Sequence, residues 1–334
     1  MFEIKLQLFS TDVNPINITT QTSMSPTMKT FYDTTLLENA REQMVFTQFG
    51  KKQVMKGNKV EWRKFNTFDK ALTPLTEGVI PTGKTFGMTN VEGVISQYGD
   101  FTAVSDRLEL ESFDDVIFGA TEEMGAAEGA TYDTLTRNVI VGGNSVMYCP
   151  NGTTEVNSRT NLTNACVLTP DVVSRAATWL KKNKAPKIDG CYVALIHPSV
   201  AYDLRKSDDW KEFHKYNDVA PIFKGEIGML HGVRFIETNE APVWKATKTS
   251  HATYGTLFLG KDAFGILDPE GEGMEMIVKT KGQIGGPLEQ FSTIGYKFCH
   301  GAKILYQERL LRVESGSSFG NVDDHNIGEP ADAN

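Results

Sequence analysis

The spacing of apolar residues divides the first third of the chain into segments of different character. Residues 1–26 are polar, and residues 26–49 carry apolar side chains at three- and four-residue intervals until Gly50 ends the pattern, which predicts a helix after an extended arm. Residues 59–65 alternate in the manner of a strand, and β-like sequence returns at residues 91–104. The stretch between these two strands is rich in Gly and Pro and has no helical period. We therefore predict a long hairpin with too few apolar residues for a core of its own.

The strongest helical pattern begins at Ser112, which with Asp115 fits a capping box. Its apolar positions keep one face over about 25 residues, a length near 40 Å. Gly119, Gly125 and Gly129 lower the intrinsic helix propensity and indicate close approach of another backbone. The apolar face consists of Phe113, Val116, Ile117, Ala120, Met124, Ala127, Leu135 and Val139.

The second half of the chain mixes both kinds of element. Thr169 and Pro170 are an N-cap and a first-turn proline, so a helix begins there. Residues 191–196 form an apolar run typical of a buried strand, and residues 291–313 form a β-rich block. Helices and strands follow one another without a repeat, which predicts an α+β fold.

Charge is spread unevenly along the 334 residues, whose formal net charge is −8. Residues 41–70 hold eight Lys/Arg and three Asp/Glu, whereas residues 106–133 hold nine acids and one Arg. The acidic balance argues against a dedicated DNA-reading protein. No apolar run approaches the roughly 18–20 residues of a membrane span, and the N-terminus lacks the apolar core of a signal peptide. We expect no membrane association and synthesis in a cytoplasm.

One motif suggests nucleotide chemistry. Residues 78–85 read GVIPTGKT and satisfy the GxxxxGK[ST] pattern, in which backbone N–H groups and a Lys bind phosphates. A working P-loop needs a buried strand before the loop and a helix directly after it. Neither pattern flanks this segment, so we interpret it as the tip of a flexible hairpin.

Other catalytic constellations are not found in the sequence. The six histidines lack metal-ligand spacing, the four cysteines form no CxxC pair, and no GxSxG frames a serine. The helical acids are interpreted as a solvated face rather than an acid–base pair; they are Asp114, Asp115, Glu122, Glu123 and Glu128. We predict no catalytic residue, no cofactor, no metal site and no enzyme.

Several segments, in order and spacing, resemble the N-four-like major capsid family of tailed bacteriophages, which has the Hong Kong 97-like capsid fold. The similarity covers about residues 28–315. It is carried by TTLLENAR at 34–41, GNKVEWRKF at 57–65, LTEG at 75–78, GEIG at 225–228, GVRFI at 232–236, GYKF at 295–298 and AKIL at 302–305.

The resemblance implies a role for each region of the chain. Residues 1–55 would be the N-terminal arm and 56–105 the extended loop that lies across a neighbouring subunit. Residues 106–145 would hold the spine helix of the peripheral domain, completed by strands at 276–315. Residues 146–275 would form the axial domain, and 316–334 a flexible acidic tail.

The resemblance also implies partners. The chain would self-assemble into hexamers and pentamers of an icosahedral head, in a virion built in the host bacterial cytoplasm. Portal and decoration proteins and non-specifically contacted double-stranded DNA would accompany it. Because the chain lacks the N-terminal scaffold domain of some members, a separate scaffolding protein is implied, or assembly without one. The expected assembly contacts are Phe31, Leu37, Gly78, Pro81, Gly83 and Lys84.

Two alternatives remain at this stage. One is an encapsulin-like nanocompartment shell, which shares the fold, and the other is a P-loop nucleotide-binding enzyme. We further hypothesise that the acidic helix, through Glu122, Glu123 and Glu128, faces the interior of the shell and repels packaged DNA.

Overall fold

A computed structural model describes most of the chain from residue 44 onward. The described residues are 17–18, 44–55, 57, 59–66, 68, 70–80, 83–111, 116–208, 210–211, 226–245, 252–269, 273–280, 283 and 290–319. The chain divides into two compact units, the first made of residues 1–44, 97–132 and 271–299 and the second of the remainder. Helix α3 (Val116–Val141) and strand β14 (Phe291–Ile304) each contribute to both units.

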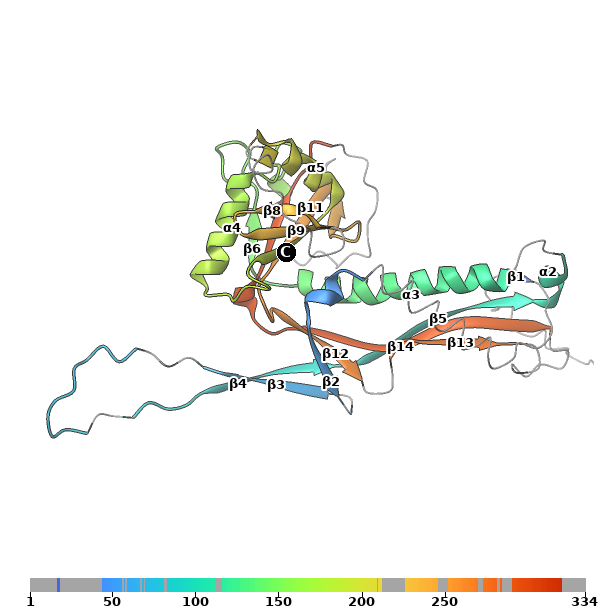
Figure 1. Ribbon diagram of the computed structural model, residues 1–334, viewed down its shortest axis with the longest axis horizontal. Helices are drawn as coiled ribbons and strands as arrows, with labels where there is room; N and C mark the ends of the chain where they lie inside the picture. The colour runs from blue at the N-terminus through green and yellow to red at the C-terminus, as the bar shows by residue number, and fades with distance from the viewer. Residues whose placement is uncertain are drawn as a thin grey trace, which may run out of the picture. The chain divides into compact units, whose positions relative to one another are not determined.

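In the first unit a helix lies along a sheet (Figure 1). β1 (Asn17–Ile18) pairs in parallel with β5 (Ser96–Ser105), and β13 (Glu275–Lys279) pairs antiparallel with β14. The short helix α2 (Asp106–Glu111) follows β5, and α3 packs its apolar face on the sheet. The core of this unit consists of Val104, Ile117, Met276 and Ile294, with Ala120, Met124 and Val278 half-buried against it.

The second unit is built on a mixed sheet that is buried on both faces. Among the described residues the strand order is β6-β15-β11-β7-β9-β8, with β10 paired to β11. In β7, Ala194 belongs to the core cluster on one face and Val193 and Leu195 to the cluster on the other. This alternation follows from the two-residue period of a strand, and the apolar run of β7 predicts burial on both sides.

The elements of this sheet and of its covering helices are mostly short. The strands are β6 (Val146–Tyr148), β7 (Tyr192–Ile196), β8 (Glu226–Leu230), β9 (Val233–Glu237), β10 (Val243–Lys245), β11 (Ala252–Leu259) and β15 (Leu310–Ser315). The helices are η1 (Phe46–Phe49), η2 (Arg159–Asn161), α4 (Pro170–Lys182), α5 (Pro198–Lys206) and η3 (Gln307–Arg309).

A second group of strands supports the hairpin. β12 (Phe264–Pro269) pairs in parallel with β2 (Lys51–Met55) and antiparallel with the end of β14. β3 (Lys59–Phe65) and β4 (Met88–Val94) pair antiparallel over their whole length, from Lys59 opposite Val94 to Phe65 opposite Met88. Figure 1 shows this hairpin extending from the second unit.

Most of the predicted elements are present. The structure confirms the strand at 59–65, the helix opened by Thr169 and Pro170, the buried strand after residue 191 and the β-rich block at 291–313. Residues 112–115 of the predicted capping box and residues 26–43 of the helix predicted at 26–49 lie outside the described residues. The described end of that helix differs from the prediction, because only Phe46–Phe49 form a short 3-10 helix, η1.

Two details differ from the sequence prediction. The β-like sequence at 91–104 contributes to two strands, of which only β4 pairs with β3, whereas β5 pairs with β1 and β14. The prediction that Glu128 lies on a solvated helix face is wrong, because its side chain is fully buried while Glu122 and Glu123 are exposed. Glu128 lies four residues after Met124 on the face of α3 that packs on the sheet, so its charge gave no indication of its burial.

Candidate assembly surface

The base of the hairpin is held by Trp62. The side chains of β3 alternate between exposed and half-buried, and Trp62 belongs to the half-buried set. Its ring lies over Gly93 and Gly265, where an added Cβ would come within 2.7 and 2.8 Å of ring atoms. The indole therefore fits only because both positions lack a side chain, and this contact fixes the hairpin to β12.

The connection beyond the base exposes an unusual amount of apolar surface. Leu72, Leu75 and Ile80 are 84%, 77% and 93% exposed. Burying such side chains stabilises by roughly 25 cal/mol per Å², so leaving them in water forgoes a large favourable term. Contiguous exposed apolar surface marks a protein interaction site. The other large apolar residues exposed on the hairpin and its connection are Phe65, Phe68, Val79, Phe86, Met88 and Val94.

Three aromatic rings gather where the strands give way to this connection. The ring centroids of Phe65 and Phe86 are 4.8 Å apart, and those of Phe68 and Phe86 are 5.7 Å apart. Such ring pairs stabilise by about 0.5–1.5 kcal/mol beyond their buried area. All three rings nevertheless remain more than half exposed, so they offer a preformed apolar contact to a partner.

The expected contact residues fall partly on this surface. Gly78, at φ +76°, lies in a turn that Val79 closes by donating its N–H to the Thr76 carbonyl at 3.2 Å. Gly83 and Lys84 are exposed farther along the same connection. The remaining three expected residues, Phe31, Leu37 and Pro81, lie outside the described residues.

The P-loop-like segment has no nucleotide-binding context. The described residues on either side of Gly78 form no strand, and strand β4, rather than a helix, begins at Met88. A helix N-terminus is what places several N–H groups around a phosphate. The GKT sequence thus belongs to an exposed connection.

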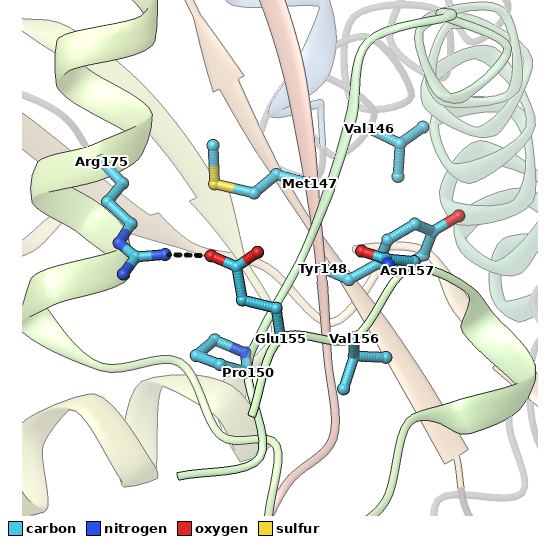
Figure 2. Close-up of a pocket in the computed structure, with 8 residues that line it drawn as sticks. All are labelled: Val146, Met147, Tyr148, Pro150, Glu155, Val156, Asn157 and Arg175. Carbon is cyan, nitrogen blue, oxygen red and sulfur yellow. Dashed lines mark ion pairs between the residues drawn. The ribbon is translucent and has the colours of Figure 1, made fainter. Parts of the chain in front are cut away.

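A hollow of about 300 Å³ lies beside β6 and α4 (Figure 2). The Glu155 carboxylate points toward Arg175, with 3.6 Å between the paired atoms, and Arg175 also meets Asp171 at 3.1 Å. Its lining otherwise consists of Val146, Met147, Tyr148, Pro150, Val156 and Asn157, without His, Cys or Ser. The cation in this hollow is thus already paired with two carboxylates.

Buried polar groups in the second unit join distant segments. Asp133 accepts hydrogen bonds from the N–H groups of Val45, at 3.0 Å, and Thr47, at 3.2 Å, which begin η1. Burial raises the pKa of Asp133 to about 6, although these hydrogen bonds act in the opposite direction. The Asp133 side chain thus caps η1 in place of a local N-cap and ties this segment to α3.

A histidine continues the same pattern one turn along α3. The Nε2 of His300 lies 3.1 Å from the Thr136 hydroxyl, and burial lowers the pKa of His300 to about 4. The imidazole is therefore neutral at pH 7 and serves as a buried hydrogen-bonding group. Within the described residues, no three His, Cys, Asp or Glu side chains are placed to hold a metal ion.

A buried ionic cluster joins β15 to η2. Glu314 is fully buried and lies 2.8 Å from a guanidinium nitrogen of both Arg159 and Arg312. The guanidinium of Arg159 also lies 4.1 Å from the centre of the Trp244 ring. A buried carboxylate with two cations satisfies the requirement that buried charge be paired. The charges of Glu314, Arg159 and Arg312 therefore stabilise the fold by pairing with one another.

Sequence reasoning missed a basic hollow at the base of the hairpin. It is lined by residues of β2, β3, β4, η3 and the turns near residues 262 and 305. The excess of Lys and Arg at 41–70 was the available signal. That Arg309 also lines this hollow became visible only in the fold.

Among the described residues, no helix has both the length and the apolar composition of a membrane span.

Comparison with known proteins identifies the family of the chain. A family model described as phage capsid protein matches residues 97–267, which is more than half of the chain. No curated protein matches the sequence.

Solved structures show the shared fold. The capsid of cyanophage P-SCSP1u covers 94% of both chains at 14% identity, with a TM-score of 0.61. The match to the cyanophage Pam1 capsid covers 95% of this chain and 100% of the Pam1 chain, at 12% identity and with a TM-score of 0.64. The match to the capsid of Ralstonia phage GP4 covers 80% of this chain and 87% of the GP4 chain, at 16% identity and with a TM-score of 0.62.

Proposed function

The chain belongs to the phage capsid protein family and is a structural major capsid protein, and from this premise we propose that its copies assemble through the extended loop into hexamers and pentamers. These capsomers form the icosahedral head that encloses the double-stranded DNA of a tailed phage. The apolar surface of residues 66–87 carries the proposal, because it is too exposed to serve the isolated subunit.

The regions of the chain take the roles expected of this fold. Residues 56–105 act as the extended loop, 106–145 and 276–315 as the peripheral domain, and 146–275 as the axial domain. Residues 1–55 act as the N-terminal arm, and 316–334 as an acidic tail. Assembly contacts include Gly78, Gly83 and Lys84 at the loop, with Phe31, Leu37 and Pro81 beyond the described residues.

The role is structural rather than enzymatic, and its partners are other head proteins. The subunit works without a cofactor and meets a portal, decoration proteins and a separate scaffolding protein in the virion. Assembly takes place in the host bacterial cytoplasm, and DNA is contacted without sequence preference. The nanocompartment alternative shares the fold, but the match to the phage capsid family favours the phage head.

Electron microscopy of a three-residue loop variant tests this function. The wild-type chain, expressed with the neighbouring head genes, is expected to form closed shells or discrete pentamers and hexamers. The variant Leu72→Ser/Leu75→Ser/Ile80→Ser should fold normally, because these side chains are exposed, but yield at least about tenfold fewer shells, since each lost apolar contact weakens the interface.

The control is Val54→Ser on β2, which removes a 60% exposed apolar side chain outside the connection at residues 66–87. It should assemble as the wild type does. A wild-type chain that stays a monodisperse monomer in every preparation contradicts the shell function. Normal shells from the triple variant contradict the role of the loop alone.

A further inference from the structure

A hollow of about 210 Å³ at the base of the hairpin gathers positive charge. Lys51 comes from β2, Arg63 and Lys64 from β3, and Arg309 from η3. Among the described residues that line the hollow, Asp262 is the one carboxylate. We call these residues the basic pocket.

Two of the cations are held in place by one aromatic ring. The Lys64 ammonium lies 4.6 Å, and the Arg309 guanidinium carbon 3.8 Å, from the centre of the Tyr306 ring. Arg309 also donates a hydrogen bond to the Lys261 carbonyl at 3.0 Å. The negative face of the ring favours both cations, so their positions are set before any partner arrives.

The positive charge of the basic pocket is only partly balanced. Lys64 meets Glu308 at 3.6 Å, whereas Lys51 and Arg63 form no ion pair with a described residue and are exposed. Like charges held around one hollow repel one another, and an anion between them removes that cost. The pocket is thus suited to a carboxylate or a phosphate.

The chain itself holds the complementary charge. Residues 106–133 are its most acidic segment, and within it Glu122 and Glu123 are adjacent and exposed on α3. Neither forms an ion pair with a described residue. Glu128 and Asp133 are buried and cannot meet a partner.

We propose that the basic pocket of one subunit receives the Glu122 and Glu123 carboxylates of a second copy. In this contact the two carboxylates lie between subunits, so it replaces the hypothesis from the sequence that they face the shell interior and repel DNA. The inference rests on the proposed self-assembly and names one of its contacts. A shell holds many copies of one chain at high local concentration, which favours an acidic ligand carried by the chain over one in solution. Carboxylates also suit Arg63, because guanidinium and carboxylate form two parallel hydrogen bonds.

A charge exchange tests the contact in the full chain. Lys51→Glu/Arg63→Glu and Glu122→Lys/Glu123→Lys are each expected to lower the yield of shells by about tenfold, since like charges then face each other. The four substitutions together restore opposite charges and are expected to return the yield to within about threefold of wild type. Lys181→Glu/Lys182→Glu on α4 makes the same charge change at an exposed site and should assemble normally.

Folding and assembly are separated by thermal melting of each unassembled subunit. If a double reversal fails to fold, the milder glutamine pair at the same site replaces it, with an expected loss of about threefold. These pairs are Lys51→Gln/Arg63→Gln and Glu122→Gln/Glu123→Gln. Full yield from both reversals, or a loss that the combined variant does not recover, overturns the contact.

Another outcome points to a different partner. If Lys51→Glu/Arg63→Glu forms normal shells that retain less DNA, the pocket binds phosphate and the contact between subunits is wrong. If the wild-type chain forms no shells under any condition, the proposed assembly itself fails. The two failures are therefore distinguishable.

Discussion

At the scale of single residues, Glu128 is a carboxylic acid placed where a helix packs on a sheet. It is fully buried, and neither of its oxygens has a hydrogen-bond partner among the described residues. Burial without a partner raises the pKa of Glu128 to about 7, because removing the carboxylate from water disfavours its charged form. The group is therefore protonated in the folded unit at mildly acidic pH.

The stability of the chain should fall as the pH rises toward 7. Below pH 4.5, the ordinary pKa of a glutamate, Glu128 is neutral in both the folded and the unfolded chain, so its burial does not lower stability through charge. Between pH 4.5 and 7 the unfolded chain releases the proton that the folded chain retains, and the free energy of unfolding falls. Glu128→Gln is expected to stabilise by about 1–3 kcal/mol at pH 8 and to change little at pH 4.5. Urea unfolding at both pH values measures the difference.

The matched control is Glu122→Gln, six residues earlier on the same helix and exposed. It removes the same charge without relieving a buried one, so it should leave stability unchanged within about 0.5 kcal/mol at both pH values. An equal gain from both variants would assign the effect to net charge. No gain from Glu128→Gln at pH 8 would show that the buried carboxylate finds a partner.

At the scale of elements, close approach of strands decides which glycines matter. A Cβ added at Gly301 in β14 would lie 2.6 Å from the Val94 carbonyl oxygen of β4, a backbone atom that cannot turn aside. Gly301→Val is therefore expected to lower stability by about 1–3 kcal/mol. Gly83→Ala, where nothing lies within 4 Å, should change it by less than about 0.5 kcal/mol. Thermal unfolding compares the two, and equal effects would contradict the close strand contact.

The same scale explains what the sequence could and could not predict. β3, α4 and β7 were predictable because a short stretch contains the whole signal: alternation, a Thr-Pro cap or an apolar run. The parallel pairing of β2 with β12 was not, because it joins residues some 200 positions apart without a local pattern. Glu128 was misassigned since its sequence neighbours are acidic and exposed, and only the fold shows which side of α3 meets the sheet.

The candidate surface follows the same division. The connection of the hairpin lies within one stretch of sequence, so its length and its lack of a helical period were predictable. Its position across a neighbouring subunit is implied by the family resemblance alone, and its exposed apolar side chains became visible only in the structure. The basic pocket draws Lys51, Arg63 and Arg309 from separate segments, so only its excess of positive charge near residues 41–70 was visible beforehand. Tyr306, which positions two of the cations, had no sequence signature at all.

At the scale of the whole molecule, the proposed assembly leaves the loop exposed in the free subunit and covers it in the shell. The sensitivity of the loop to protease should therefore fall on assembly. Lys70 and Lys84 lie on the connection of the hairpin, and both are exposed. Trypsin is expected to cut the unassembled subunit after these residues, giving peptides that begin at Ala71 and Thr85. Assembly should slow both cuts by at least about tenfold, because cleavage needs a segment that can leave its neighbours.

Mass spectrometry of the early digestion products makes this prediction specific to the loop. The triple loop variant, which retains both lysines, is the control: it should be cut at the same rate as the unassembled wild type under assembly conditions. Equal cutting rates for wild-type shells and free subunits would mean that the loop stays exposed on the head. The apolar surface of the loop would then bind a different head protein rather than a neighbouring subunit. Protection in the shells together with normal cutting of the variant ties burial of the loop to assembly itself.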